Sequence, residues 1–274
     1  MVTLDIGENL NEDTKIMKHI ISKLVRVIRS MRLRCGVSGV KLADEVLYVS
    51  NRGSPWGYCF PYRSIATTDM RQIHIMSNGF HKHLEKKYTE ADFVIETTDT
   101  VIDCGAFVGG FSVAAHRLGA RRVVSVEPSS RNLRCLKINL LMHRAERVEI
   151  IDAGLGEKCG TAKLNLSYSG CDDSLLEPDL GSMGESEEVN ILSIDRLVEV
   201  LSVDPKHLFL KVEAEGYEVE IIRGLNDLRP RLIVVDITPE RDGCSPRNEI
   251  EMILRSFGYN NLIVTDRCLF AKRY

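Results

Sequence analysis

The stretch Thr100-Val-Ile-Asp-Cys-Gly-Ala-Phe-Val-Gly-Gly-Phe-Ser112 decides the fold that the sequence predicts. Its apolar start predicts a short strand, and its end opens a helix expected from about Gly109 to Leu118. Between them runs the pattern Asp103-x-Gly105-x-x-x-Gly109. Glycine has no Cβ and therefore tolerates a positive φ and the close approach of other atoms. The pattern thus predicts a tight turn at which a ligand lies against bare backbone, beside the free N–H groups of a helix N-terminus.

The spacing within this turn discriminates between cofactors. A dinucleotide-binding loop has the pattern G-x-G-x-x-G, but Phe107 stands where its second glycine would be. A phosphate-binding P-loop needs Gly-Lys-Ser/Thr, which does not follow. The acidic Asp103 suits a cationic or amino-acid ligand better than a phosphate, and adenosylmethionine carries both an ammonium and a sulfonium. The alternative is that Gly105 and Gly109 serve only a tight turn between strand and helix.

Acidic residues follow the next two predicted strands. The strand over residues 122–127 ends at Glu127, whose carboxylate can accept two hydrogen bonds from a ribose diol, as in other doubly wound folds. After the strand over residues 148–151 come Asp152 and Ala153. That position predicts a contact with the amino group of an adenine ring.

Apolar strands alternate with helices from Thr100 onward. Further strands are expected over residues 161–166, 208–212 and 232–237, and further helices over residues 131–143, around 219–225 and over 249–257. Such alternation predicts an α/β fold in which a mostly parallel sheet is covered on both faces. Residues 261–264 and 268–271 predict a closing antiparallel hairpin. Sheets of this kind bind ligands at the carboxyl ends of their strands.

The segment before this alternation differs in character. Apolar residues at three- and four-residue spacing predict an amphipathic helix over residues 12–33. Aromatic and turn residues predict short strands or a hairpin over residues 37–67, and residues 69–87 again resemble a helix. We therefore expect an N-terminal α+β cap over residues 1–98 and a second domain over residues 99–274. The helical segment could cap the ligand site or pair two copies into a homodimer.

The segment Ser167 to Glu188, SYSGCDDSLLEPDLGSMGESEE, is rich in Gly, Ser, Asp and Glu. This composition predicts a mobile loop. A long loop beside a ligand site often acts as a lid, and solvated filler is the alternative.

Composition limits the classes of function. The formal net charge of −3 lacks the basic excess that is typical of nucleic-acid-binding proteins. No stretch approaches the roughly 18 uninterrupted apolar residues of a membrane helix, and residues 1–11 lack the features of a signal peptide. We expect a cytoplasmic protein with no membrane or nucleic-acid partner. Its eight cysteines contain no C-x-x-C pair, and His81-x-His83 has no suitably spaced carboxylate, so no metal site is predicted.

With these motifs the chain resembles the FkbM-type methyltransferases over roughly residues 75–240. The resemblance rests on the glycine turn, on Glu127-Pro128, on Asn139 and on Ile194-Asp-Arg-Leu197. It rests most of all on residues 210–224, LKVEAEGYEVEIIRG, where the family usually has Lys-Ile-Asp-Val-Glu-Gly-Ala-Glu. This chain has Glu213 where the family has Asp, and Tyr217 where the family has Ala.

The resemblance implies a Rossmann-like class I methyltransferase fold and transfer of a methyl group from S-adenosylmethionine. Family members commonly methylate hydroxyls of sugars or secondary metabolites, so a small-molecule or sugar acceptor is implied. Such a hydroxyl must lose a proton, and a positioned base accelerates that step by roughly 10²–10⁴-fold. The candidates are Glu213 first and Glu215 second, which strand alternation places on one side with Lys211. The alternative is that one of these glutamates forms an ion pair or shapes the loop.

The predicted site therefore combines two catalytic candidates with a cofactor pocket. The residues expected to contact the cofactor lie at the ends of the first three strands: Asp103, Gly105, Ala106, Phe107, Gly109, Glu127, Pro128, Asp152 and Ala153. Two other functions stay open at this point. One is a non-catalytic relative that acts as a binding module, motivated by Glu213. The other is a nicotinamide-dependent oxidoreductase, against which Phe107 argues.

Overall fold

A seven-stranded sheet forms the centre of the protein. The computed structural model describes residues 37–43, 46–51, 57–61, 70–168, 170–178 and 181–273, so the helix predicted over residues 12–33 lies outside the described residues. The strands follow the order β12-β13-β11-β10-β4-β5-β6. They are β4 (Thr100–Cys104), β5 (Arg122–Glu127), β6 (Val148–Asp152), β10 (Leu208–Val212), β11 (Leu232–Asp236), β12 (Asn261–Val264) and β13 (Cys268–Lys272).

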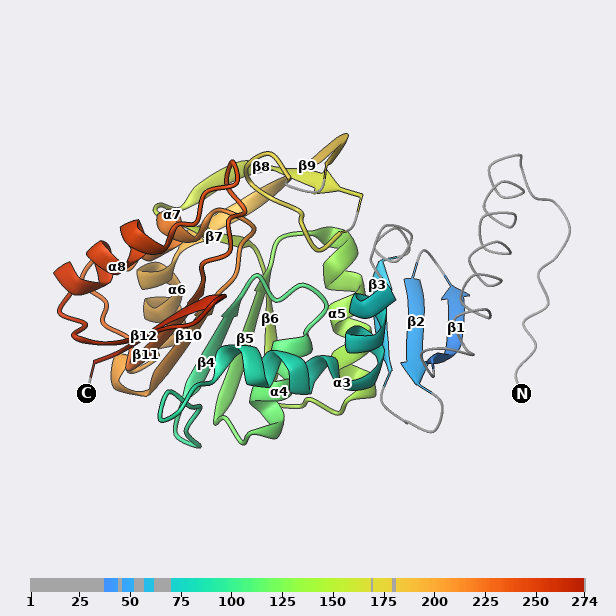
Figure 1. Cartoon of the computed structure of the whole chain (residues 1–274), viewed down its shortest axis with the longest axis horizontal. Coiled ribbons are helices and arrows are strands. Elements are labelled where there is room, and N and C mark those ends of the chain that lie inside the picture. Colours follow the sequence, from blue (N-terminus) through green and yellow to red (C-terminus); the bar gives the residue numbers. More distant parts are fainter. Residues whose placement is uncertain are drawn as a thin grey trace, which may run out of the picture.

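The sheet is mostly parallel. Strand β4 lies inside the sheet between its parallel partners β5 and β10, and β13 runs antiparallel between β11 and β12 (Figure 1). The chain runs from β4 to β5 and β6 toward one edge of the sheet, and from β10 to β11 toward the other edge. The predicted Rossmann-like fold, including its closing antiparallel hairpin, is confirmed.

Helices cover both faces of this sheet (Figure 1). One face packs against α6 (Ile194–Leu201), α7 (Glu218–Arg223) and α8 (Arg247–Ser256), and the other against α3 (Met70–Tyr88) and α4 (Gly110–Arg117). Helix α5 (Ser130–Met142) follows β5, and the one-turn 3₁₀ helix η1 (Pro205–His207) precedes β10. Because side chains alternate along a strand, successive residues of β4 belong to the two different cores.

A smaller three-stranded sheet stands beside the ends of the main strands. It has the order β7-β9-β8 and consists of β7 (Gly154–Gly156), β8 (Gly160–Ser167) and β9 (Ser182–Ser193). The prediction of a mobile loop over residues 167–188 is wrong from Ser182 onward, because β9 begins there and pairs antiparallel with β8. Most of this end of β9 faces solvent on both sides, so it lacks the apolar alternation that identifies a strand in a sequence.

The described part of the N-terminal segment contains the expected strands and helix. Strands β1 (Val37–Ala43), β2 (Val46–Asn51) and β3 (Tyr58–Pro61) form an antiparallel sheet, which lies beside α3 and α5 (Figure 1). Helix α3 is kinked at Gly79, and its Phe80 and Leu84 side chains pack against Gly110 at the start of α4. A Cβ at Gly110 would lie 2.4 Å from the Phe80 ring. The domain division at residue 98 stays a prediction, and α3 makes close contacts across it.

Asn139 of α5 ties the N-terminal sheet to the glycine turn. Its side-chain amide donates hydrogen bonds to the carbonyl oxygens of Cys59 and Val108, at 2.9 and 2.8 Å, and its Oδ1 accepts from the Cys59 N–H. Tyr58 and Phe60 of β3 are buried in the same core, so these two aromatic residues serve packing. Two other aromatic residues of the segment over residues 37–67, Trp56 and Tyr62, lie outside the described residues.

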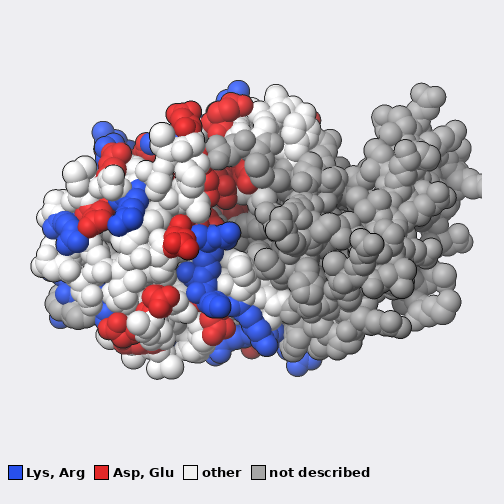
Figure 2. Space-filling model, viewed as in Figure 1, with Lys and Arg blue, Asp and Glu red and all other residues white. Residues whose placement is uncertain are grey.

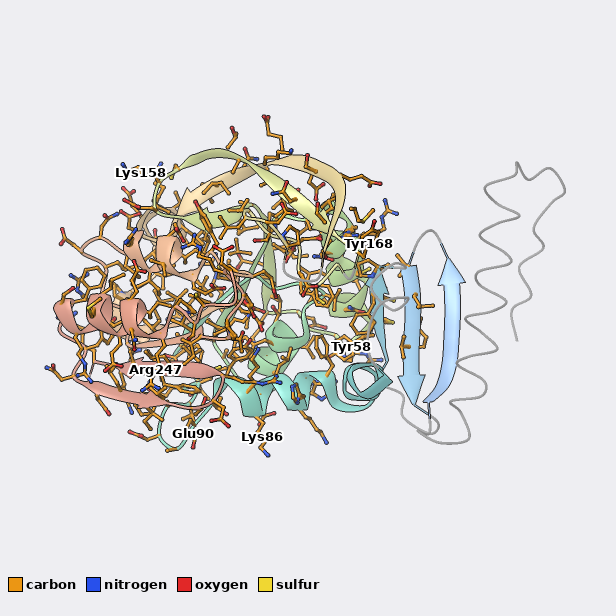
Figure 3. The ribbon with its side chains drawn as sticks, turned by 45° about the horizontal axis from the view of Figure 1, so that its top comes forward. Tyr58, Lys86, Glu90, Lys158, Tyr168 and Arg247 are labelled. Atoms are coloured by element: carbon orange, nitrogen blue, oxygen red, sulfur yellow. The ribbon has the colours of Figure 1, made fainter. Side chains whose placement is uncertain are left out.

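A buried polar cluster lies at the same junction, where Tyr58 is labelled in Figure 3. The Arg117 guanidinium, which can only donate, lies 3.0 Å from His81 Nε2 and 3.3 Å from His143 Nδ1. Both histidines must therefore be neutral to accept. His143 Nε2 donates to the Gly57 carbonyl oxygen at 2.9 Å, and its ring stacks on Tyr58. Burial, with Arg117 and His143 nearby, lowers the pKa of His81 to about 4.

This cluster predicts a loss of stability in mild acid. The pKa of His81 is lower in the folded than in the unfolded chain, so the unfolded chain binds more protons once the pH falls below about 6.5. Stability contributed by the neutral ring is complete above that pH and is lost as the pH falls toward 4. His81→Gln retains an acceptor for Arg117 but has no imidazole to protonate. Between pH 7 and pH 5 we expect its free energy of unfolding to fall by about 2 kcal/mol less than that of the original chain. Urea unfolding at both pH values measures this, and parallel losses would contradict it.

Charged side chains of both signs are distributed over the face of the molecule in Figure 2, and a short run of basic residues crosses it over helix α3. None of the helices in the described ranges combines the length and apolar character that crossing a membrane requires.

Candidate functional site

A cavity opens at the carboxyl ends of β4, β5 and β10. Its empty space, counted out to its open mouth, is about 1000 Å³. Seven of the predicted site residues line it: Gly105, Ala106, Phe107, Glu127, Pro128, Glu213 and Glu215. The location is the one that doubly wound sheets use for ligands.

The glycine turn forms one wall of the cavity. Gly105 has φ +70°, and a Cβ added there would lie 1.7 Å from the Glu213 carbonyl oxygen. The turn is fastened to the next strand, because the N–H groups of Gly105 and Ala106 both donate to the Val126 carbonyl oxygen at 3.1 Å. The turn therefore needs glycine at 105 for two separate reasons, its backbone conformation and the contact with the β10 tip.

Glu127, the last residue of β5, contacts this turn from the neighbouring strand. Its carboxylate accepts hydrogen bonds from the Phe107 N–H at 2.8 Å, the Ser129 N–H at 2.9 Å and the Asn132 amide at 3.2 Å. Burial is the main reason that its pKa rises to about 7, against the lowering effect of these donors. A carboxylate has about four acceptor positions, so one position is available to a ligand hydroxyl.

Four of the predicted cofactor contacts are not among the residues that line the cavity: Asp103, Gly109, Asp152 and Ala153. Asp103 is fully buried between the sheet and α4, where it bonds to Ser112 at 2.6 Å and to Lys211 at 3.0 Å. Strand register explains this, because Asp103 and Lys211 are partners in neighbouring strands and face the same helix. Asp152 is exposed at the sheet edge, and the cavity wall at β7 consists of Gly154 and Leu155.

Glu213 is held between two lysines. Its Oε1 pairs with Lys87 Nζ at 2.5 Å, and its Oε2 lies 3.3 Å from Lys211 Nζ. Lys87 also pairs with the buried Asp236 at 2.5 Å, and Lys211 donates to the Gly105 carbonyl oxygen at 2.8 Å. Burial alone would raise the pKa of Glu213, but the two lysines outweigh it and hold the pKa far below its ordinary value. Such a carboxylate accepts a proton poorly.

Glu215 has the opposite electrostatics. Burial raises its pKa well above the ordinary value, and Glu240 raises it further. Burial and the nearby Glu218 likewise raise the pKa of Glu240 to about 8. Glu218 shapes the loop, since its carboxylate accepts from the Ala214 N–H at 2.7 Å and from the Gly216 N–H at 3.3 Å. Of the two glutamates proposed as bases, Glu215 thus has the higher affinity for a proton.

Residues 170–176 cover the cavity and are tied down on two sides. Asp173, which lines the cavity, pairs with Arg131 of α5 and accepts from the Ser129 hydroxyl at 2.9 Å. The Ser174 hydroxyl donates to the Glu215 carbonyl oxygen at 2.7 Å. This part of the predicted lid therefore connects the tips of β5 and β10 above the ligand space.

Several residues of the site could not be identified from the sequence motifs. Phe80 and Leu84 line the cavity, and Lys87 holds Glu213, yet all three belong to α3, well before the glycine turn. Asp173 was visible only as one acid of an acidic segment. For Lys87 the sequence shows only a pair of lysines in the last turn of α3, and lysines at such a position are normally exposed to solvent.

Comparison with known proteins points to one family. The family model described as "Methyltransferase FkbM domain" matches residues 103–260. None of the curated proteins matches the chain. Among solved structures, the methyltransferase FkbM from Methylobacillus flagellatus KT is 16% identical with a TM-score of 0.44, and the alignment covers 76% of this chain and 56% of that chain. The chain thus spans little more than half the length of that structure.

Two further solved structures resemble the chain at a similar level. M. jannaschii TYW2 in complex with AdoMet is 11% identical with a TM-score of 0.45, covering 86% of this chain and 88% of that one. Precorrin-6y C5,15-methyltransferase from Geobacter metallireducens GS-15 is 17% identical with a TM-score of 0.39, covering 71% and 87%.

Proposed function

Since the chain belongs to the FkbM methyltransferase family, we propose that it methylates a hydroxyl group of a small hydroxylated or glycosyl acceptor. Its cofactor is S-adenosylmethionine, which supplies an electrophilic methyl group on a sulfonium. The protein's own contribution is to bind the two reactants in line, to exclude water and to take the proton that the hydroxyl loses. Holding reactants in this way can supply about 7–11 kcal/mol of the barrier.

The residues around the cavity fit this cofactor. The turn from Gly105 to Phe107 lines the cavity, and Glu127 retains an acceptor position for a ribose hydroxyl. Four carboxyl groups line the cavity, those of Glu127, Asp173, Glu213 and Glu215. Lys87 and Lys211 hold Glu213 ionised, and its negative charge complements a ligand that carries a sulfonium and an ammonium.

One observation carries the choice of a hydroxyl acceptor: Glu215 lines the cavity, and its pKa is raised by burial. A carboxylate with raised proton affinity can remove the proton of an alcohol as the new bond forms, and the ideal pKa for that role lies near the working pH. Glu213, fixed by two lysines, instead supplies negative charge. We therefore assign Glu215 as the proton acceptor and Glu213 as part of the binding wall.

We also propose that the N-terminal α+β segment is a cap on the acceptor side of the cavity. Phe80 and Leu84 of α3 reach the cavity wall from this segment. Both are apolar, so they would contact the non-reacting part of an acceptor.

Release of S-adenosylhomocysteine tests the proposed reaction. The protein is incubated with the cofactor and a panel of hydroxylated and glycosyl compounds, with amines and thiols as comparison acceptors. Product formed with hydroxyl acceptors alone supports the proposal, and product formed only with amines or thiols contradicts it. Tight cofactor binding without turnover on any acceptor would favour the non-catalytic relative instead.

Glu127→Gln is expected to weaken binding of S-adenosylmethionine by about ten- to a hundredfold. A hydrogen bond to a charged group contributes about 1.5–3 kcal/mol, and glutamine replaces one carboxylate oxygen by a donor. Isothermal titration calorimetry measures the change. The matched control is Asp152→Asn, at the neighbouring strand tip but exposed and outside the cavity lining, for which we expect less than about a twofold change. Equal losses in the two variants would contradict the role of Glu127.

A further inference from the structure

Lys87 reaches the candidate site from outside the part of the chain that the family model matches. It lies in the last turn of α3, whereas the match begins at residue 103. Its ammonium nevertheless contacts the tips of two sheet strands, pairing with Glu213 after β10 and with Asp236 at the end of β11. The Lys87 side chain is 11% exposed and Asp236 1%, so this contact is almost entirely shielded from water.

The contact with Lys87 gives a role to Glu213, which stands where the family has Asp. The Glu213 carboxylate is shared: one oxygen bonds to Lys87 and the other faces Lys211. Glu213 is also the most exposed member of this ionic network, at 23%, and it lines the cavity. It is therefore the carboxylate through which the network meets a ligand.

The formal charges of the network do not cancel. Lys87 and Lys211 contribute two positive charges, and Asp103, Glu213 and Asp236 contribute three negative charges. One negative charge remains, and it is presented to the cavity at Glu213. A buried carboxylate without such cations would take up a proton and become neutral.

We infer that Lys87 is a positioning residue that keeps Glu213 ionised and fixed at the cavity wall, so that the site favours the cationic cofactor S-adenosylmethionine over its neutral product. This inference rests on the proposed cofactor site and adds a residue that the family pattern does not contain. Because methyl transfer removes the sulfonium charge, the product binds more weakly than the cofactor to the same wall. The device acts through Glu213, because Lys87 itself does not line the cavity.

Other charged and titratable groups surround Glu213 and must be held constant in any test. On α3 they are His83, Lys87 and Tyr88; on the sheet they are Asp103, Lys211 and Asp236; in the adjoining loops they are Glu215 and Glu240. The comparison is therefore made between variants at one pH.

The test measures proton release when S-adenosylmethionine binds. Calorimetric titrations at pH 7 in two buffers of different ionisation enthalpy give the number of protons exchanged. In Lys87→Met, Glu213 is protonated before the cation arrives, so binding is expected to release between about one half and one proton more than in the original chain. Affinity is expected to fall about tenfold, since the proton must be displaced.

Three variants make the result specific. Lys87→Arg restores the cation and should return both values to those of the original chain. Lys86→Met changes the neighbouring lysine, which is exposed and points away from the protein in Figure 3, and should alter neither. Lys87→Met combined with Glu213→Gln should show no extra proton release, since the proton resides on Glu213. Extra release that persists in the double variant overturns the assignment.

A separate measurement covers the case in which Lys87→Met does not fold. Glu213→Gln alone should weaken S-adenosylmethionine about tenfold and leave S-adenosylhomocysteine within about twofold, because only the former is a cation. Equal weakening of both ligands overturns the inference. Binding of S-adenosylmethionine to the original chain with unchanged values in Lys87→Met also overturns it, and leaves the proposed function intact. Absence of binding to the original chain overturns both.

Discussion

Replacing Gly105 with alanine is expected to abolish detectable binding of S-adenosylmethionine. The new Cβ would lie 1.7 Å from the Glu213 carbonyl oxygen, so the glycine turn and the β10 tip must separate. The positive φ at this position adds about 1–2 kcal/mol of strain for any residue with a Cβ. This shift moves the turn away from Glu127 and displaces both Glu213 and Glu215. Titration calorimetry measures the binding, and thermal unfolding of the same sample measures the accompanying loss of stability.

Gly243→Ala is the matched control for this experiment. Gly243 has nearly the same backbone conformation, with φ +68°, but a Cβ there meets nothing within 4 Å. It therefore reports the cost of the conformation without the collision. We expect a modest fall in melting temperature and unchanged cofactor affinity. Cofactor binding that survives in Gly105→Ala would show that the ligand does not depend on this turn.

Glu215→Gln is expected to lower the rate of methyl transfer by roughly 10²–10⁴-fold, the usual contribution of a positioned base. Cofactor affinity should stay within about twofold, because the amide keeps the size of the side chain. The pKa of Glu215 is raised, so transfer by the original chain should fall with decreasing pH at a higher pH than an ordinary carboxyl would give. The variant should lose that pH dependence. Single-turnover rates across pH, measured on the acceptor that gives most product, provide both values.

Glu213→Gln is the informative comparison for Glu215→Gln. The two residues lie two positions apart on one loop and both line the cavity, but only Glu213 is paired with lysines. We expect Glu213→Gln to affect cofactor affinity and Glu215→Gln to affect the chemical step. The reverse outcome would return the role of proton acceptor to Glu213.

The main sheet could be predicted from the sequence because its signals are local. The strands over 122–127, 208–212 and 261–264 coincide with β5, β10 and β12, since each is a short apolar or alternating run bounded by turn residues. Strand β9 was missed because a two-sided exposed ribbon rich in Gly, Ser and Glu carries no such pattern. Its pairing with β8 depends on a contact between segments that composition describes as a loop.

Where a motif acts through its own backbone, the residues predicted from it line the cavity, whereas partners that come from a distance could not be identified from the sequence. Gly105 and Glu127 lie where the glycine turn requires them. Asp103 had the correct residue type for a cation, but the register of β4 and β10 turns it toward Lys211 beneath α4. Choosing Glu215 over Glu213 as the proton acceptor requires knowledge of Lys87, which is 126 residues away from Glu213 in the sequence. Whether a glutamate forms an ion pair or accepts a proton depends on tertiary contacts, which the local sequence does not show.

The close packing of Phe80 and Leu84 on Gly110 limits how the chain can be recombined with its relatives. A hybrid that joined a different amino-terminal half to this carboxyl-terminal half would need small side chains, or none, at the crossing point. Any residue larger than glycine at 110 would meet the ends of the Phe80 and Leu84 side chains, which must then shift and change the cavity wall that they line. The two halves must therefore change in concert, and exchange of one half alone should yield hybrids whose ligand site is open on one side.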